Sequence, residues 1–140
     1  KAEAQQNRTI FLDVPATHWG RGYINYASSI SVTDGGERLV MGVGDGTFHP
    51  DENIAFDQAV TMTMRLLGYT AADVPTGATW YDGYLSTART IEHQDGLEDD
   101  AHDAPVTLAH AAVLFRNLLF DILRHIRVDS LETDRRILLL

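Results

Sequence analysis

Carboxylate and imidazole side chains are the groups in this sequence best suited to hold a metal ion or to move a proton. The densest run of carboxylates comprises Glu92, Asp95, Glu98, Asp99, Asp100 and Asp103. Its spacing does not match an EF-hand, because Leu97 would occupy a ligand position and the glycine is misplaced. We therefore expect a solvated acidic loop and no metal site.

The six histidines show no pattern typical of a metalloprotease, since no His-x3-His pair stands beside a carboxylate. Asp57 or Asp82 could form an acid–base pair with a histidine, but nothing in the sequence brings such groups together. No Gly-x-Ser-x-Gly nucleophile motif is present. We expect most histidines on the surface, and we predict that the chain is not an enzyme and uses no cofactor.

Aromatic and small polar residues indicate a different chemistry, the binding of sugars. Trp19 and Trp80 could stack on sugar rings, and the turn Gly44-Asp45-Gly46-Thr47 could offer amide and carboxylate groups to a glycan. The competing interpretation, which the usual burial of tryptophan favours, makes Trp19 and Trp80 core anchors in equivalent positions. For the Gly44–Thr47 segment, the competing interpretation is a plain turn between two short strands.

The two tryptophans open one phrase that the chain contains twice: WGRGYINYASSI from residue 19 and WYDGYLSTARTI from residue 80. In each copy apolar residues recur at i, i+4, i+8 and i+11, which predicts one face of an α-helix. Thr17 and Thr79 are candidate N-caps. A glycine costs about 1 kcal/mol inside a helix relative to alanine, so its recurrence at Gly22 and Gly83 suggests a close helix approach.

A second helix follows each copy. The first is predicted from about Ala55 to Leu67, with Gly68 at its C-terminal end, and it aligns with the run from Val106 at an offset of 52 residues. The loop before it carries turn signals and two candidate short strands, Leu39–Met41 and Thr47–Phe48. The unit is helix–loop–helix, written twice, and one such unit cannot bury its own apolar face, so the two must pack together.

The second closing helix continues beyond the repeat. Its apolar residues alternate steps of four and three, a seam about 30 Å long if helical throughout: Leu108, Ala112, Phe115, Leu119, Ile122 and Ile126. Asp129 with Glu132 could cap a further short helix that ends in the apolar run 137–140. Exposed apolar clusters usually mark contacts, so either the tail folds back or the seam pairs with a second copy, and the 3.5-residue spacing favours the second copy.

The composition bounds the class of protein. A chain of 140 residues with 44% hydrophobic and 22% charged residues is predicted to fold as a globular domain. It has no cysteine, which excludes a disulfide scaffold and a thiol nucleophile. The net charge of −9, without a basic cluster, argues against binding to nucleic acid, and no apolar run is long enough for membrane insertion.

The first unit resembles a known family. Its segments FLDVPATHWGRGYINYA, GVGDGTFHPDENI and QAVTMTMRLLGY are similar to the S-layer homology (SLH) module of bacterial surface proteins. The resemblance runs from Phe11 to Tyr69. A weaker copy, Val74 to Leu119, keeps Trp80, Gly96-Leu97, Ala104-Pro105 and the closing helix but lacks the Asp-Gly-Thr-Phe loop.

The resemblance implies a mainly α fold: two helix–loop–helix SLH-type repeats with short β-strands in the first loop, plus a long C-terminal helix. The expected divisions are an extension (1–10), repeat 1 (11–69), a degenerate repeat 2 (70–119) and a helix extension with tail (120–140). The family usually places three such modules around a pseudo-threefold axis.

The resemblance also implies a function. SLH modules attach proteins noncovalently to a secondary cell-wall polymer, often carrying pyruvate ketals, so we expect an extracellular, cell-wall location. Expected ligand residues are Trp19, Trp80 and the turn Gly44-Asp45-Gly46-Thr47. The alternative is an assembly module that keeps the fold, has lost glycan binding and contacts a second copy or other surface-protein modules. It rests on Phe56 and Leu108, which replace the arginine that leads ligand binding in the family.

Overall fold

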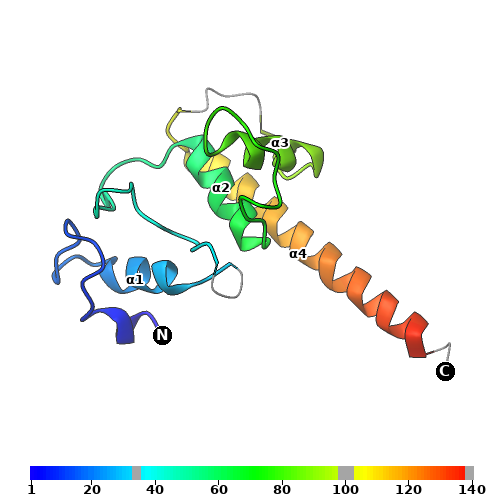
Figure 1. The fold of residues 1–140 in the computed structure, drawn as a ribbon, viewed down its shortest axis with the longest axis horizontal. Helices are drawn as coiled ribbons and strands as arrows, with labels where there is room; N and C mark the ends of the chain where they lie inside the picture. The colour runs from blue at the N-terminus through cyan, green and yellow to red at the C-terminus, as the bar shows by residue number, and fades with distance from the viewer. Residues whose placement is uncertain (33–35, 98–102, 138–140) are drawn as a thin grey trace.

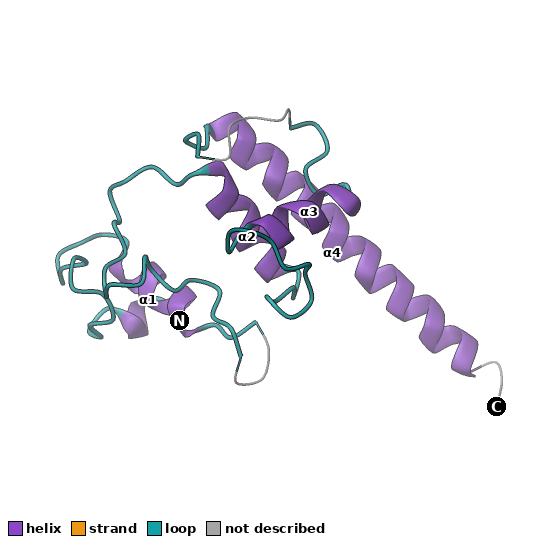
Figure 2. Ribbon diagram, turned by 45° about the horizontal axis from the view of Figure 1, so that its top comes forward, coloured by secondary structure: helices purple, strands orange, loops and turns teal. Residues whose placement is uncertain are grey.

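The computed structural model describes residues 1–32, 36–97 and 103–137, with the side chains of the last helix described as far as Arg124. The chain forms a 3-10 helix η1 (Glu3–Gln5) and four α-helices: α1 (Arg21–Ser29), α2 (Phe56–Leu66), α3 (Asp82–Thr90) and α4 (Leu108–Ile137) (Figure 1). In these ranges no strand forms, and the only β pairing is two isolated bridges (Figure 2). The prediction of a mainly α fold is confirmed.

The hydrophobic core lies among α2, α3 and α4, with α2 in contact with both of the others. Its buried residues come from all three helices and recur at helical spacing on α2 and α3: Phe56, Val60, Met64, Tyr84, Leu85, Ala88 and Leu114. Burial of one such large apolar side chain contributes about 1.5–3 kcal/mol. The core therefore combines the closing helix of the first unit with both helices of the second.

The starts of the two closing helices are joined through their backbones. The amide of Phe56 donates to the carbonyl of Ala104 at 2.9 Å, and the amide of Val106 donates to the carbonyl of Ile54 at 2.9 Å. Ile54 and Val106 occupy the same position in the repeat, so equivalent residues pair with each other. These bonds satisfy backbone groups that helix starts otherwise leave without a partner.

Helix α1 packs on η1 and on none of α2, α3 and α4. Its buried face is polar. Arg21 donates to the carbonyls of Arg8 and Val14, and Asn25 donates to those of Gln5 and Arg8. The first ten residues are thus tied to α1 by hydrogen bonds, while the apolar side of α1 is left without a helical partner.

The carboxylate of Glu37 connects the first unit's loop to the core. It forms an ion pair with Arg65 of α2, accepts hydrogen bonds from the Tyr84 hydroxyl at 3.0 Å and from the Ala71 amide at 3.0 Å, and is largely buried. Burial raises the pKa of Tyr84 above its usual value, so its hydroxyl remains a donor at neutral pH. The Arg65 guanidinium also lies 5.5 Å from the centre of the Tyr84 ring.

The interpretation of the two tryptophans as buried core anchors is wrong. Trp19 is 83% exposed and Trp80 is 57% exposed. The reason is the start of each helix: α1 begins at Arg21 and α3 at Asp82, so each tryptophan lies in the turn before the helix and is not on its face. The predicted N-caps Thr17 and Thr79 are wrong for the same reason.

Two further expectations are corrected. The strands predicted at Leu39–Met41 and Thr47–Phe48 do not form, because positive φ angles at Gly42, Gly44 and Gly46 turn the chain repeatedly. The break predicted at Asp129 is also absent, since α4 continues through it to Ile137. The final residues 138–140 of the predicted apolar tail lie outside the described residues.

The recurring glycines have a common structural role. A methyl group at Gly22 would stand 2.5 Å from the carbonyl oxygen of Ala2, and one at Gly83 would stand 2.2 Å from that of Pro75. In both units the chain that precedes the helix crosses directly over the glycine. A close approach exists at both glycines, but its partner is the segment that precedes each helix, so the predicted approach of two helices is wrong.

We predict that Gly22→Ala and Gly83→Ala each lower the free energy of unfolding by about 1–3 kcal/mol, because the added methyl group forces the crossing backbone away. Helix propensity alone predicts the opposite sign, a gain of about 1 kcal/mol. Denaturant unfolding measures the difference. Ser86→Ala, at an exposed position of α3, is the matched control and should stay within about 0.5 kcal/mol of the parent chain.

We also predict that Glu37→Gln destabilises the fold by about 2–4 kcal/mol, since it leaves the guanidinium of Arg65 buried without its counter-charge. Chemical denaturation followed by circular dichroism gives the value. Glu52→Gln removes an exposed pairing with His49 and should change stability by less than about 0.5 kcal/mol. Equal effects of the two substitutions would contradict the role assigned to Glu37.

Candidate ligand-binding site

A cavity of about 540 Å³ lies where the first unit's loop, α2 and the start of the second unit meet. Loop residues between 39 and 54 form one wall, α2 forms the base, and Trp80 stands at the side. The residues that line it are Leu39, Val40, Met41, Gly42, Val43, Phe48, His49, Pro50, Glu52, Asn53, Ile54, Gln58, Thr61, Met62, Arg65 and Trp80. It is large enough for a small ligand or one to two sugar units, given the size range of such sites.

Two buried polar side chains of α2 line this cavity with an atom left unbonded. Thr61 is 1% exposed and Arg65 is 8% exposed, yet the Thr61 hydroxyl and the Arg65 Nε group have no hydrogen-bond partner among the residues that the structure describes. Leaving a buried donor without a partner costs about 1–3 kcal/mol. Such atoms are favourable contacts for a polar ligand, because the ligand supplies the missing bond.

The loop wall of the cavity is held by the carboxylate of Asp13. It accepts hydrogen bonds from the amides of Phe48 at 2.9 Å and His49 at 2.7 Å. Partial desolvation raises the pKa of Asp13, but the bonds from His49 and Phe48 outweigh it and hold the pKa below its usual value. A hydrogen bond with Glu52 raises the pKa of His49, so this imidazole carries more positive charge near neutral pH.

The turn Gly44-Asp45-Gly46-Thr47 is closed by its own side chains. Asp45 accepts hydrogen bonds from the Thr47 hydroxyl and amide, and these bonds lower the pKa of Asp45. The turn does not itself line the cavity, but its neighbours Val43 and Phe48 do. The turn therefore positions two residues that line the cavity.

Of the residues predicted to bind ligand, Trp80 lines the cavity, whereas Trp19 and the turn Gly44–Thr47 do not. The side chain of Trp19 stacks on His18 instead, with ring centres 5.7 Å apart. The sequence analysis missed Thr61 and Arg65. Their spacing of four residues, which puts two polar groups on one face of an apolar helix, was the available signal.

The predicted association residues of α4 lie on its outer face. Leu108, Phe115, Leu119 and Ile122 are all exposed, and the side chain of Ile126 lies outside the described residues. The core side of the helix is instead formed by Leu114 and Leu118. The exposed residues Leu108, Ala112, Phe115 and Leu119 are called the α4 stripe below.

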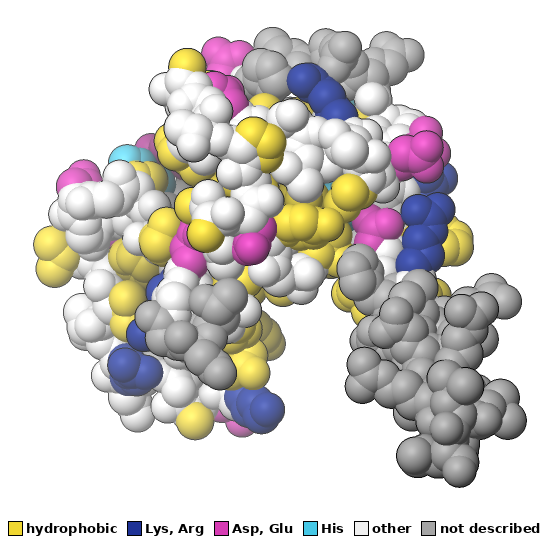
Figure 3. Space-filling model, turned by 45° about the vertical axis from the view of Figure 1, so that its right-hand side comes forward, with side chains coloured by type: hydrophobic (Ala, Val, Ile, Leu, Met, Phe, Trp, Pro, Cys, Tyr) yellow, Lys and Arg dark blue, Asp and Glu magenta, His cyan; other side chains and the backbone are white. Residues whose placement is uncertain are grey.

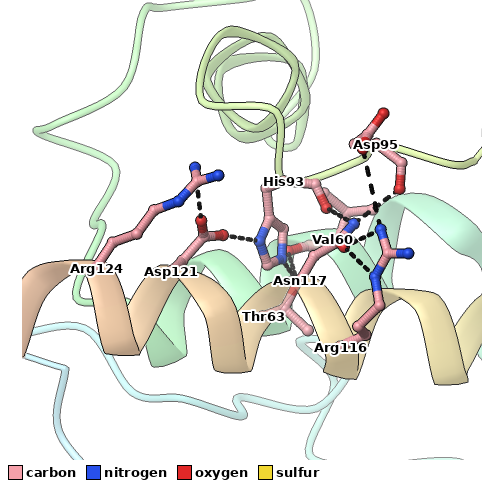
Figure 4. Close-up of polar contacts among 8 residues, drawn as sticks. All are labelled: Val60, Thr63, His93, Asp95, Arg116, Asn117, Asp121 and Arg124. Carbon is pink, nitrogen blue, oxygen red and sulfur yellow. Dashed lines mark hydrogen bonds and ion pairs between the residues drawn. The ribbon is translucent and has the colours of Figure 1, made fainter.

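A hydroxyl–imidazole–carboxylate chain lies elsewhere, inside the core. His93 Nδ1 is 2.7 Å from the Asp121 carboxylate and Nε2 is 2.8 Å from the Thr63 hydroxyl, while Asn117 donates to the His93 carbonyl at 2.9 Å (Figure 4). This order of groups is used in nucleophilic catalysis. Here His93 is fully buried and Thr63 is buried too, so a substrate has no access. The cluster ties the end of α3 to α2 and α4, and it corrects the expectation of a surface position for His93.

Within the part of the chain that the structure describes, no helix combines the length and the apolar character needed to cross a membrane. Over the same ranges, no group of three or more His, Asp or Glu side chains is placed to hold a metal ion. Glu98, Asp99 and Asp100 of the acidic loop lie outside the described residues. Basic side chains on the face drawn in Figure 3 are scattered and form no patch.

Comparison with known proteins is consistent with a helical repeat module. Residues 10–60 match the family model described as the S-layer homology domain. The chain thus belongs to the S-layer homology family through its first unit, and the match ends within α2. No solved structure matches the chain significantly.

Three relatives carry surface-related names. The chain is 33% identical over 94 residues to a cell surface protein of Thermoanaerobacter kivui. The aligned region is 67% of this chain and 11% of that protein. The chain is 29% identical over 138 residues to a surface layer protein of Brevibacillus choshinensis, covering 97% of this chain and 11% of the relative. It is 37% identical over 90 residues to a middle cell wall protein of Brevibacillus brevis, covering 64% and 8%.

The chain therefore spans only about a tenth of the length of the curated relatives it matches. The family match and the relatives' names together support a cell-surface location and a structural, non-enzymatic protein.

We predict that the loop wall depends on ionised Asp13. The pKa of Asp13 is lower in the folded state than in the unfolded chain, so its ionised carboxylate stabilises the folded state at pH values above the unfolded pKa of about 3.9. This stabilisation is lost as the pH falls through the folded pKa. Hydrogen exchange at the Phe48 and His49 amides should therefore show protection that is constant from neutral pH to about pH 5 and is lost in acid.

Asp13→Ala should remove that protection already at neutral pH. Asp73→Ala is the matched control, because Asp73 also has a lowered pKa, from bonds with Thr70, but does not contact this loop. Unchanged exchange at Phe48 and His49 in Asp13→Ala would show that the loop holds its shape without the carboxylate.

Proposed function

We propose that this chain is a non-catalytic anchoring module that binds a secondary cell-wall polysaccharide in the cavity beside Trp80. The observation that carries the proposal is the pair of unbonded buried polar atoms, on Thr61 and Arg65, beside an exposed aromatic ring. The family to which the first unit belongs and the surface-related names of the relatives support the same function.

The cavity offers one contact for each feature of an acidic sugar. The exposed indole of Trp80 stacks on the apolar face of a sugar ring. The free Nε–H of Arg65 donates to a carboxylate, such as that of a pyruvate ketal, and the Thr61 hydroxyl bonds to a ring substituent. A chain of net charge −9 repels an anionic polymer at long range, so attraction must come from these local groups.

Arg65 also accounts for the loss of the family's arginine. The residue at that position, Phe56, is buried in the core and cannot reach a ligand. Arg65 lies further along the same helix, with its guanidinium oriented by Glu37 and by the Tyr84 ring. An arginine held in this way loses little side-chain entropy on binding.

A second function, protein–protein assembly, is favoured by a different observation. The α4 stripe leaves three large apolar side chains, Leu108, Phe115 and Leu119, exposed on one helix face. Exposed apolar faces of this kind usually mark contacts with other molecules. Wall binding and assembly use separate surfaces, so they are compatible in one module.

The test is calorimetric titration with purified wall polysaccharide, with its pyruvate ketals intact or removed. We expect Trp80→Ala to weaken binding by about tenfold or more, the effect of removing a central aromatic contact. Trp19→Ala is the matched control, an exposed tryptophan at the equivalent repeat position that does not line the cavity, and it should leave the affinity unchanged. Equal losses in both variants would contradict a site at this cavity.

A second substitution separates binding from folding. Thr61→Val keeps the shape of the side chain and removes a hydroxyl that has no partner, so the unbound protein should be as stable as the parent or more so. Polymer affinity should nevertheless fall about three- to tenfold, the value of one hydrogen bond. Unchanged affinity would remove Thr61 from the site, and equal affinity for polymer with and without ketals would remove the role of Arg65.

A further inference from the structure

Helix α3 packs on α2 in the core. The chain carries a second copy of each of these two helices, but the second copies do not pack on each other. The buried side of α3 carries Tyr84, Leu85 and Ala88, which pack against Phe56, Val60 and Met64 of α2. In this contact the opening helix of the second unit packs on the closing helix of the first unit. Because both helices exist in two copies, each side of this contact has a second copy elsewhere in the chain.

The second copy of the α3 side lies on α1. At the offset of 61 residues, Tyr23 corresponds to Tyr84, and Ala27 corresponds to Ala88. Tyr84 is 1% exposed, whereas Tyr23 is 68% exposed, because α1 contacts none of the core helices. On α1 the same side has no helix of the core packed on it: Tyr23 is exposed and Ala27 is half-buried. This side of α1 is called the α1 face below.

The second copy of the α2 side is the α4 stripe. At the offset of 52 residues, Leu108 corresponds to Phe56, Ala112 to Val60, and Leu119 to Leu67. Phe56 and Val60 are buried in the core cluster that includes the buried residues of α3, and Leu67 packs against the same cluster. On α4 all three counterparts are exposed, together with Phe115. Other exposed hydrophobic side chains can be seen on the face in Figure 3.

We propose that the α1 face of one copy of this chain packs on the α4 stripe of a second copy, repeating between molecules the contact of α3 on α2. Two unlike surfaces meet, so the interface is heterologous. A symmetric pairing of α4 with itself would cover the stripe but leave Tyr23 in water. The head-to-tail contact covers both. Tyr23 and Ala27 are identical to their counterparts on α3, while on α4 the counterparts of Phe56, Val60 and Met64 are Leu108, Ala112 and Arg116.

The pairing is independent of polymer binding, since neither Tyr23 nor any residue of the α4 stripe lines the cavity. Each copy carries a net charge of −9, so general electrostatics oppose association and salt should strengthen it by screening. This salt response is the reverse of that expected for an interface formed by ion pairs.

The experiment is sedimentation velocity of the intact chain over a concentration series, with Tyr23→Glu and Phe115→Glu. The parent chain should sediment faster as its concentration rises, and each variant should remain a monomer. An equimolar mixture of the two should again form a dimer, because Tyr23→Glu keeps an intact α4 stripe and Phe115→Glu keeps an intact α1 face. Only an interface between two unlike surfaces gives this recovery.

Leu12→Glu is the matched control, an apolar-to-acidic change at an exposed residue outside both surfaces, and it should associate like the parent. Thermal unfolding of every variant shows that the fold is kept. If Tyr23→Glu still associates while Phe115→Glu does not, the stripe pairs with itself and the proposal is wrong. A parent chain that stays monomeric at high micromolar concentration also overturns it, and another segment then covers these faces.

Discussion

The rest of the structure depends on the ion pair between the largely buried carboxylate of Glu37 and Arg65. Helix α1 touches none of the other α-helices, so the first unit reaches the core mainly through its loop. Glu37 anchors that loop by pairing with Arg65, accepting from Tyr84 and holding the Ala71 amide. One side chain from each of α2 and α3 thus shares a single acceptor. A largely buried charge is tolerated here because it has a partner charge and accepts further hydrogen bonds from Tyr84 and the Ala71 amide.

The cavity follows from this anchoring. Because Glu37 holds the start of the loop against α2 and Asp13 holds its far part through Phe48 and His49, the segment between them stands away from α2 and encloses a space. Arg65 belongs to both features: one part of its guanidinium pairs with Glu37, and the residue also lines the cavity, with its buried Nε group left without a partner among the described residues. The stability of the fold and the orientation of the binding group therefore depend on the same residue.

Repetition of sequence has produced two different environments. Tyr84 and Ala88 are buried in the core, while Tyr23, in the same phrase, is exposed. What differs is the neighbour, because α3 packs on α2, whereas α1 contacts none of α2, α3 and α4. In a repeat module each unit completes the one before it, and the terminal surfaces stay open until another element covers them. This explains why a chain with a well-packed core also carries large exposed apolar side chains.

The sequence by itself determined the local features: the opening and closing helix of each repeat, the need for a close approach at Gly22 and Gly83 though not its partner, the end of α2 before Gly68, where φ is positive, and the family of the first unit. These depend on periodicity and backbone sterics, which act over a few residues. Tertiary structure decided the rest. Neither the exposure of Trp19 and Trp80 nor the burial of His93 could be read from spacing, because burial depends on which segments meet across the chain. Thr61 and Arg65 became site residues only when the loop folded over α2, a contact between residues far apart in sequence.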